Sequence, residues 1–391
     1  MSKEVSPKRS RFAVSAYFLI GGTAIAVWGV HIPEVEHRLH ITHSVIGSII
    51  LLFGFGAFLA MQAMGWVIDH YGSKAITALG GITTGLALLI PAFANDVPSL
   101  AGGVFVLGAS VGILDVGMNA NGVVVERKYQ RSIFSSLHAM WSFGGIVGAA
   151  IGGVALSLAL PMSVTLSLTG AVMVTASILL WSSLVEDKPT ALPAKHEKSA
   201  GNKANRKLLS TVLWVGFMAC FAAIAEGSAV DWSALHLKTI LGASSGEAAL
   251  GVGAFSAAMA FTRLVGDKLV DRFGRFAVVR YGSLLASAGI ATAVLAPTTA
   301  IGVLGWAILG IGIAGVIPQL FIAAGNIGEE SHSGRNMAKV FGLTYFGIMA
   351  GPAIIGFLTN WIPLNTALSL GCLLTLVVAA GASILRSDKI R

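Results

Sequence analysis

Charged residues are scarce in this chain of 391 residues. Asp, Glu, Lys and Arg make up 11% of it, where an ordinary globular protein has about 25%. Hydrophobic residues make up 55%, and the mean hydropathy is +0.80. This composition excludes an ordinary soluble protein and predicts an integral membrane protein without a soluble domain.

Cysteines are scarce as well. The two in the chain, Cys220 and Cys372, both fall inside apolar runs. A disulfide framework and a metal site with cysteine spacing are therefore excluded. No spacing in the sequence sets a nucleophile beside a base or collects metal ligands, so we expect neither an enzyme nor a cofactor.

Acidic residues are outnumbered by Lys and Arg, 18 to 26, which gives a net charge of +8. In a soluble protein this excess would suggest nucleic acid. Here the basic residues lie between apolar runs, where membrane orientation explains them, and we discount nucleic acid. When the N-terminus is placed in the cytoplasm, only Arg38 and Lys238 fall on the outer side. We expect a monomer in the bacterial inner (cytoplasmic) membrane, with both termini cytoplasmic.

Twelve apolar runs are long enough to cross the hydrocarbon core of a lipid bilayer. They cover residues 12–32, 44–67, 75–95, 99–125, 133–159, 162–184, 208–236, 247–267, 276–297, 300–325, 337–360 and 364–386. The Lys-rich stretch 185–207 predicts a cytoplasmic linker between residues 1–184 and 208–391. The expected fold class is an all-α membrane protein, with twelve transmembrane helices in two pseudo-symmetric six-helix bundles.

An internal repeat supports the division into two halves. Asp69 and Asp271 lie in similar turns after the second span of each half, and they are 202 residues apart. Phe143-Gly144 and Phe346-Gly347 are 203 residues apart. Because the register holds over several predicted helices, the sequence indicates a 6+6 architecture.

The two turns resemble the signature loop of the major facilitator superfamily. The matching residues of the first turn are Gly65, Asp69, Gly72 and Lys74, with His70 in place of the usual Arg. Those of the second turn are Asp271, Arg272, Gly274 and Arg275, with Gly266 one residue further from the aspartate than usual. The resemblance implies a gating role, in which each aspartate latches one conformation by meeting a helix N-terminus or an arginine. A plain tight turn is the alternative.

The fourth span contains the most informative stretch, from Gly108 to Gly122. Its carboxylate, Asp115, would lie deep in the hydrocarbon layer, where a charged aspartate costs about 2.5 to 3.5 kcal/mol. Gly112, Asp115 and Asn119 share the spacing of the fucose permease-like branch of that superfamily. This resemblance implies proton coupling at Asp115 and substrate contact at Asn119. A purely structural hydrogen bond between helices is the alternative.

The first span lacks the acid that works with the fourth-span acid in that branch, and it has Thr23, Trp28 and His31 instead. The seventh span contains two acids that could replace it, Glu226 and Asp231. Five residues apart on a helix, they point about 140° away from each other and do not share one proton. The further candidates are His138 for proton coupling, and Trp28, Gln319 and Tyr345 for substrate binding.

Three classes of function compete. Buried polar groups in spans four and seven favour a secondary active transporter that moves a small polar, sugar-like solute by proton coupling and alternating access. The glycine-rich fifth span from Gly144 keeps proton-antiport efflux of small organic compounds open, although close helix packing explains such glycines too. A non-transporting membrane sensor is less expected, because no segment outside the spans is long enough for a signalling domain.

Overall fold

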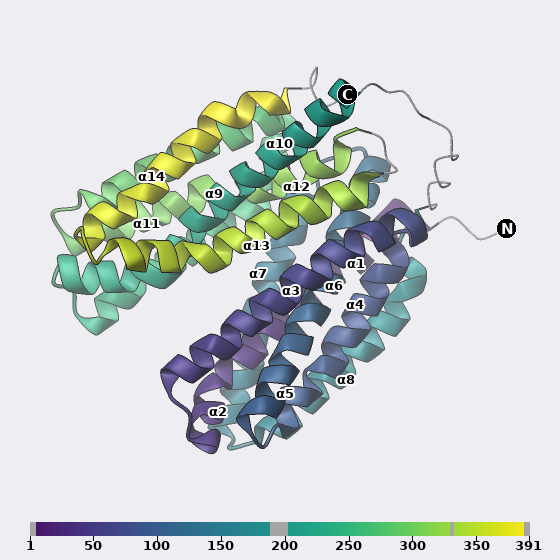
Figure 1. The fold of residues 1–391 in the computed structure, drawn as a ribbon, viewed down its shortest axis with the longest axis horizontal. Coiled ribbons are helices and arrows are strands. Elements are labelled where there is room, and N and C mark those ends of the chain that lie inside the picture. Colours follow the sequence, from purple (N-terminus) through teal and green to yellow (C-terminus); the bar gives the residue numbers. More distant parts are fainter. Residues whose placement is uncertain (1–4, 188–201, 329–331, 387–391) are drawn as a thin grey trace. The chain divides into compact units, whose positions relative to one another are not determined.

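The computed structural model describes residues 5–187, 202–328 and 332–386, and all of its regular structure there is helical (Figure 1). The all-α fold expected from the sequence is thus confirmed. Residues 188–201, which form most of the expected linker 185–207, lie outside the described residues.

Eleven described helical segments are long and apolar enough to cross a membrane. One of them, Gly246–Val294, has 49 residues. At 1.5 Å per residue it would extend about 73 Å, more than twice the hydrocarbon core. Its backbone turns at Gly274, which has φ 80° and ψ 160°. The segment therefore supplies two spans, and the described spans match the twelve that the hydropathy predicts.

The chain forms two compact units, each of which takes in a short segment from the other half of the sequence. The first unit consists of Met1–Gln130, Leu137–Glu197 and Glu330–Ala338. Its helices are α1 (Pro7–Val30), α2 (Ile32–Leu39), α3 (His43–Tyr71), α4 (Ser73–Ala87), α5 (Leu89–Phe93), α6 (Val97–Tyr129), most of α7 (Phe134–Ser157) and α8 (Met162–Leu180), followed by the 3-10 turn η1 (Trp181–Ser183).

The second unit consists of Arg131–Ser136, Lys198–Glu329 and Lys339–Arg391. Its helices are α9 (Asn202–Ile240), α10 (Ser245–Val294), α11 (Thr299–Ile313), α12 (Val316–Asn326), most of α13 (Ser333–Leu358) and α14 (Leu364–Gly381), followed by the 3-10 turn η3 (Ala382–Leu385).

Helix α6 of the first unit, which holds the fourth-span candidates, begins at a capping box in which Asp96 and Ser99 exchange hydrogen bonds. These bonds hold the pKa of Asp96 below its ordinary value.

Glycines let helices pack backbone to backbone in the first unit. A Cβ atom at Gly144 of α7 would collide with the carbonyl oxygen of Leu19 in α1. One at Gly148 would lie 2.5 Å from the carbonyl oxygen of Thr23. The glycine-rich fifth span is therefore the face on which α7 meets α1, as small residues at helix interfaces allow.

The second unit repeats this contact. A Cβ atom at Gly347 of α13 would lie 2.5 Å from the carbonyl oxygen of Cys220 in α9, and one at Gly351 would lie 3.3 Å from the Cα of Ile224. These positions follow their first-unit counterparts by 201 to 203 residues. The repeat read from the sequence is thus a repeat of helix packing as well.

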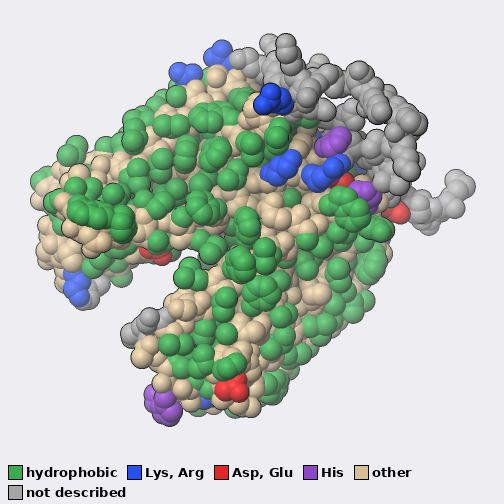
Figure 2. Space-filling view, viewed as in Figure 1, with side chains coloured by type: hydrophobic (Ala, Val, Ile, Leu, Met, Phe, Trp, Pro, Cys, Tyr) green, Lys and Arg blue, Asp and Glu red, His purple; other side chains and the backbone are tan. Residues whose placement is uncertain are grey.

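The exterior of each unit is apolar. Large side chains such as Leu179, Phe261 and Leu295 are between 68% and 79% exposed, and hydrophobic side chains cover much of the visible surface in Figure 2. Exposed apolar surface on this scale is not found on a soluble monomer. The chain is a multi-pass membrane protein.

Candidate functional site

The first unit contains a buried polar pair in the middle of α6. Nδ2 of Asn119 donates a hydrogen bond to Oδ1 of Asp115 at 2.7 Å and another to the Asp115 carbonyl oxygen at 2.8 Å. Asp115 is 8% exposed and Asn119 is fully buried. The four-residue spacing places both side chains on one face of α6.

One hydrogen-bond acceptor of this pair is unsatisfied. Oδ1 of Asn119 has no hydrogen-bond partner among the described residues. A buried amide oxygen without a partner costs about 1 to 3 kcal/mol. An acceptor held in this way is ready for a ligand hydroxyl or a water.

The glycines of the same stretch hold α6 against α3. A Cβ atom at Gly108 would collide with the carbonyl oxygen of Phe53, and one at Gly112 would lie 2.6 Å from that of Ala57. Gly108 and Gly112 are therefore packing residues. Their close contact fixes the backbone that positions Asp115 one turn further on.

The polar residues of the first span have different roles. The Thr23 hydroxyl donates to the carbonyl oxygens of Leu19 and Gly144 and so belongs to the α1–α7 contact. Trp28 is 4% exposed. His31 is fully buried at the break between α1 and α2, and its Nδ1 lies 2.8 Å from Oε2 of Glu34.

The second unit contains a partly buried ion pair in the membrane-spanning region. Nη2 of Arg263 lies 3.6 Å from Oε1 of Glu226, and the two side chains are 8% and 24% exposed. Oε2 of Glu226 has no partner within the described part of the chain. A charge buried in a spanning helix is normally paired, as this one is, or lies in a polar cavity.

Arg263 also donates a hydrogen bond to the backbone at a break in the tenth span. Pro318 has no N–H, so the carbonyl oxygen of Ala314, four residues earlier, loses its helical donor. Helix α11 ends at Ile313, and Nε of Arg263 donates to the Ala314 oxygen at 3.4 Å. One guanidinium thus joins α10 to the seventh span and to the break between α11 and α12. Sequence reasoning overlooked this role of Arg263, although Pro318 signalled an orphaned carbonyl.

Gln319 lies one turn beyond that break. Its side chain is 1% exposed, and neither Nε2 nor Oε1 has a partner among the described residues. A buried amide whose donor and acceptor both lack partners is costly. Such a group is unusual unless it has a function. The sequence named Gln319 as a ligand candidate, and its surroundings fit that role.

The remaining candidates are less distinctive. Asp231 is exposed on α9, five residues after Glu226. The imidazole of His138 packs on the ring of Phe18 in α1, with the centroids 5.1 Å apart. Tyr345 is half-buried in α13.

The two signature turns share one backbone conformation. Gly72 has φ 81° and ψ 160°, and Gly274 has φ 80° and ψ 160°. This region of backbone space is essentially restricted to glycine. The glycines of the two turns are therefore required by geometry, as the resemblance implies.

The aspartates of the two turns each accept a backbone N–H at the start of a helical segment. Asp69 accepts from Gly334 at 2.7 Å, at the N-terminus of α13 and inside the first unit. Asp271 accepts from Ser132 at 2.9 Å, just before α7 and inside the second unit. Gly334 and Ser132 are 202 residues apart, as are the two aspartates, so the contacts are equivalent under the repeat.

The two turns differ in their supporting contacts. Asp69 is paired with the guanidinium of Arg335. In the second copy Asp267, which occupies the register position of Gly65, accepts the N–H groups of Ser135 and Ser136 at 2.8 and 3.1 Å. Because Asp267 stands at the position of Gly65, Gly266 lies one residue further from Asp271 than Gly65 lies from Asp69.

Among the residues that the structure describes, no three His, Cys, Asp or Glu side chains gather in a way that could hold a metal ion. The polar groups described above form hydrogen bonds and an ion pair. These are the means by which a membrane protein recognises and moves a small polar molecule.

Comparison with known proteins agrees with this architecture. A family model described as the Major Facilitator Superfamily matches residues 13–236 and 216–389. An uncharacterized MFS-type transporter of Yersinia pestis is 34% identical over 369 residues, which cover 93% of each chain. An uncharacterized transporter of Sinorhizobium fredii is 32% identical over 374 residues, 95% of this chain and 97% of its own. The chain belongs to the major facilitator superfamily and is a membrane transporter.

Solved structures show the same fold. The transporter FucP in its outward conformation superimposes with a TM-score of 0.78 at 18% identity, over 96% of this chain and 98% of its own. The Escherichia coli fucose:proton symporter FucP, in a variant form, gives a TM-score of 0.76 at 17% identity with the same coverage. The likeness to FucP expected from the fourth span is thus confirmed at the level of the fold.

Proposed function

We propose that this transporter couples the movement of protons to the uptake of a small polar solute by alternating access. The observation that carries the proposal is the buried Asp115–Asn119 pair in the middle of α6. A carboxylate that binds a proton loses its charge, and the cost of keeping it inside a membrane-spanning bundle falls. Asp115 is the proposed proton carrier, and Asn119 the group that senses its protonation state.

The proton state of Asp115 determines what Asn119 can do. When Asp115 is ionised, it accepts from Nδ2 of Asn119, as in the observed geometry. When Asp115 is protonated, its new O–H can donate, and the amide of Asn119 is free to turn toward a ligand. Proton binding and solute binding are linked in this way through a single pair of side chains.

The open hydrogen-bonding atoms support a hydroxyl-rich, sugar-like solute. In the first unit, Oδ1 of Asn119 is an acceptor without a partner among the described residues. In the second unit, Oε2 of Glu226 and Oε1 of Gln319 are such acceptors, and Nε2 of Gln319 is such a donor. A hydroxyl group both donates and accepts, so hydroxyls would satisfy the open atoms of either unit. FucP, described as a fucose:proton symporter, shares the fold. Trp28 and Tyr345 are proposed apolar contacts for a sugar ring.

Glu226 is the second proposed coupling residue. Its pairing with Arg263 keeps one carboxylate oxygen engaged and leaves the other open to the solute or a proton. Proton transfer to Glu226 would weaken its attraction to Arg263 and loosen the link between the seventh and tenth spans. His138 packs on Phe18 and Asp231 is exposed, and both stay proposals of lower rank.

Gating is proposed to rest on the two signature turns. When the Asp69 and Asp271 contacts form, the cytoplasmic ends of the helices are held together, and when they break, that side opens. This assignment follows the proposed topology, with both termini cytoplasmic in the bacterial inner membrane and the chain divided into halves at residues 185–207.

The direction of coupling can be measured in proteoliposomes. A ligand-induced thermal shift with sugars, organic acids and hydrophobic cations first identifies a solute. That solute is then added outside vesicles loaded with a pH-sensitive dye, without an imposed gradient. Symport predicts acidification of the vesicle interior on solute entry. Alkalinisation would establish proton antiport instead, and no pH change would show that transport is not coupled to protons.

A further inference from the structure

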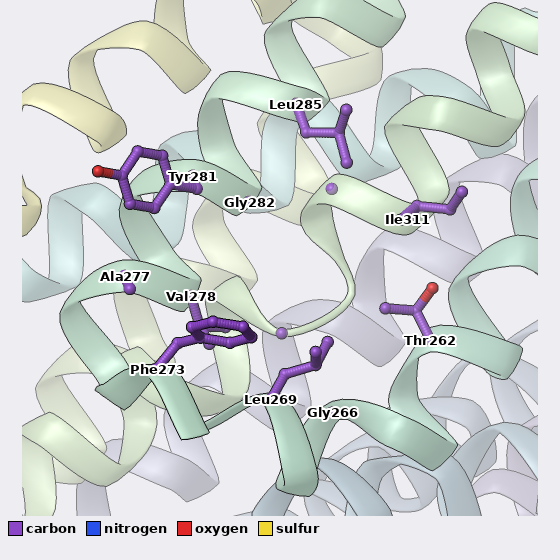
Figure 3. A pocket seen from close by; sticks show the side chains of 12 residues that line it. Thr262, Gly266, Leu269, Phe273, Ala277, Val278, Tyr281, Gly282, Leu285 and Ile311 are labelled. Atoms are coloured by element: carbon purple, nitrogen blue, oxygen red, sulfur yellow. The ribbon is translucent and has the colours of Figure 1, made fainter. Parts of the chain in front are cut away.

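A second cavity lies away from the polar groups, inside the second unit. It is a groove of about 460 Å³ between the two arms of α10 and the end of α11 (Figure 3). Leu269 and Phe273 line it from one arm of α10, Val278 and Leu285 from the other, and Ile311 from α11. Phe273 is 58% exposed and Ile311 is 44% exposed, so the groove opens on the surface of the unit.

The lining is apolar. Thr262 and Tyr281 are its only polar side chains, and the Thr262 hydroxyl already donates to the Ala258 carbonyl oxygen at 2.8 Å. A polar solute would lose its hydration in this groove without gaining hydrogen bonds, which is unfavourable. The groove suits a hydrocarbon chain.

The length of the groove matches one leaflet of a bilayer. Thr262 and Leu285 line its far end, and they lie 12 and 11 residues from the turn at Gly274. At 1.5 Å per residue, the groove extends about 16 to 18 Å from the turn. Half of a hydrocarbon core is about 15 Å thick, so a chain lying in the groove would reach from the membrane surface to the midplane.

The open end of the groove at the turn is basic. The guanidinium of Arg272 lies over the ring of the lining residue Phe273, 5.5 Å from its centroid. Lys268 precedes the lining residue Leu269 and is exposed, and Arg275 follows the turn. Two acids lie nearby: Asp271 accepts the N–H of Ser132, and Asp267 accepts those of Ser135 and Ser136.

We propose that this groove binds one acyl chain of an anionic glycerophospholipid, with the lipid phosphate at Arg272. The planar guanidinium of arginine matches phosphate oxygens and also stacks on aromatic rings, as Arg272 does on Phe273. Basic groups at the end of an apolar groove between spanning helices are a pattern that selects anionic lipids. The groove lining includes none of the proposed substrate-binding or proton-coupling residues, but Arg272 and the lining residue Gly266 belong to the second signature turn.

Native mass spectrometry tests the site. The protein is released from nanodiscs that contain equal amounts of phosphatidylglycerol and phosphatidylcholine, and the retained lipids are counted. We expect phosphatidylglycerol to be retained in preference to phosphatidylcholine, and Arg272→Gln to lower this preference about fivefold, the effect of one basic residue near the membrane surface. Ala277→Phe, which fills the groove, should abolish retention of both lipids.

Two matched variants serve as controls. Arg280→Gln removes the same charge from the same helix, but Arg280 stacks on Phe276, which does not line the groove. Ala257→Phe adds the same bulk at an exposed position of α10 outside the groove. Both should retain lipid like the wild type. Equal retention of the two lipids by the wild type, undiminished retention in Ala277→Phe, or an equal loss in Arg280→Gln would overturn the proposal.

Discussion

The carboxylate of Asp69 accepts a hydrogen bond from Nε of Arg335 at 2.8 Å, and the Asp69 side chain is 3% exposed. The same carboxylate accepts the N–H groups of Gly334 and Arg335 at the start of α13. A negative charge here meets the positive end of the helix dipole as well as a guanidinium. Three interactions thus depend on the charge of one side chain.

Asp69→Asn keeps the shape of this side chain and removes its charge. Hydrogen bonds to a charged group contribute about 1.5 to 3 kcal/mol, so the variant should shift the population toward the state in which the contact is broken. Accessibility of single introduced cysteines on each side of the membrane measures the shift. Asp96→Asn is the matched control, because Asn also caps a helix well. Labelling that is unchanged on both sides in Asp69→Asn would rule out a latch.

Gly72→Ala and Gly274→Ala should both destabilise the protein, since their backbone conformation is one that only glycine adopts readily. The expected cost is about 1 to 3 kcal/mol for each. Gly145→Ala is the control, because its Cβ would meet nothing within 4 Å in α7, and alanine favours a helix by about 1 kcal/mol. Apparent melting temperatures in detergent measure both effects. A lowered value for Gly145→Ala together with unchanged values at the two turns would contradict the prediction.

The two helix-packing contacts differ in how tight they are. A Cβ at Gly148 would lie 2.5 Å from a carbonyl oxygen, whereas one at Gly351 would lie 3.3 Å from its nearest neighbour. Gly148→Ala should therefore lower the melting temperature clearly, and Gly351→Ala should have a small effect. Equal losses of melting temperature in the two variants would contradict this prediction.

The link between Arg263 and Ala314 predicts a rescue. Arg263→Met removes the donor to the Ala314 carbonyl oxygen and leaves the Glu226 carboxylate unpaired, so it should destabilise the protein. In that background, Pro318→Ala restores an N–H that can donate to the same oxygen, and it should recover about 1 kcal/mol. Thermal unfolding of the single and double variants measures the recovery. If Pro318→Ala destabilises the Arg263→Met protein further, the stabilising effect of Arg263 does not come from its hydrogen bond to the Ala314 carbonyl oxygen.

The local parts of this arrangement could be predicted from the sequence. The four-residue spacing of Asp115 and Asn119 places them on one face of a helix, and a hydrogen bond joins them. The glycine positions of the signature turns required an unusual backbone, and Gly72 and Gly274 have it. Both predictions depend only on residues within one or two helical turns.

The long-range contacts could not be predicted in the same way. Arg335 is 266 residues from Asp69, and no periodicity identifies one basic residue among 26 as the partner. Nothing in the sequence shows that Arg263 reaches Glu226 or that Asp267 accepts the N–H groups of Ser135 and Ser136. Such contacts depend on how helices pack, which a single sequence encodes only indirectly.

The role of Asp115 as proton carrier is tested most directly by comparing exchange with accumulation in one set of proteoliposomes. Asp115→Asn mimics the protonated acid, so it should bind the solute and exchange it across the membrane at the wild-type rate. It should lose accumulation driven by an imposed pH gradient, while Asp96→Asn accumulates solute like the wild type. Full gradient-driven accumulation by Asp115→Asn would contradict the account and transfer the proton-carrying role to Glu226.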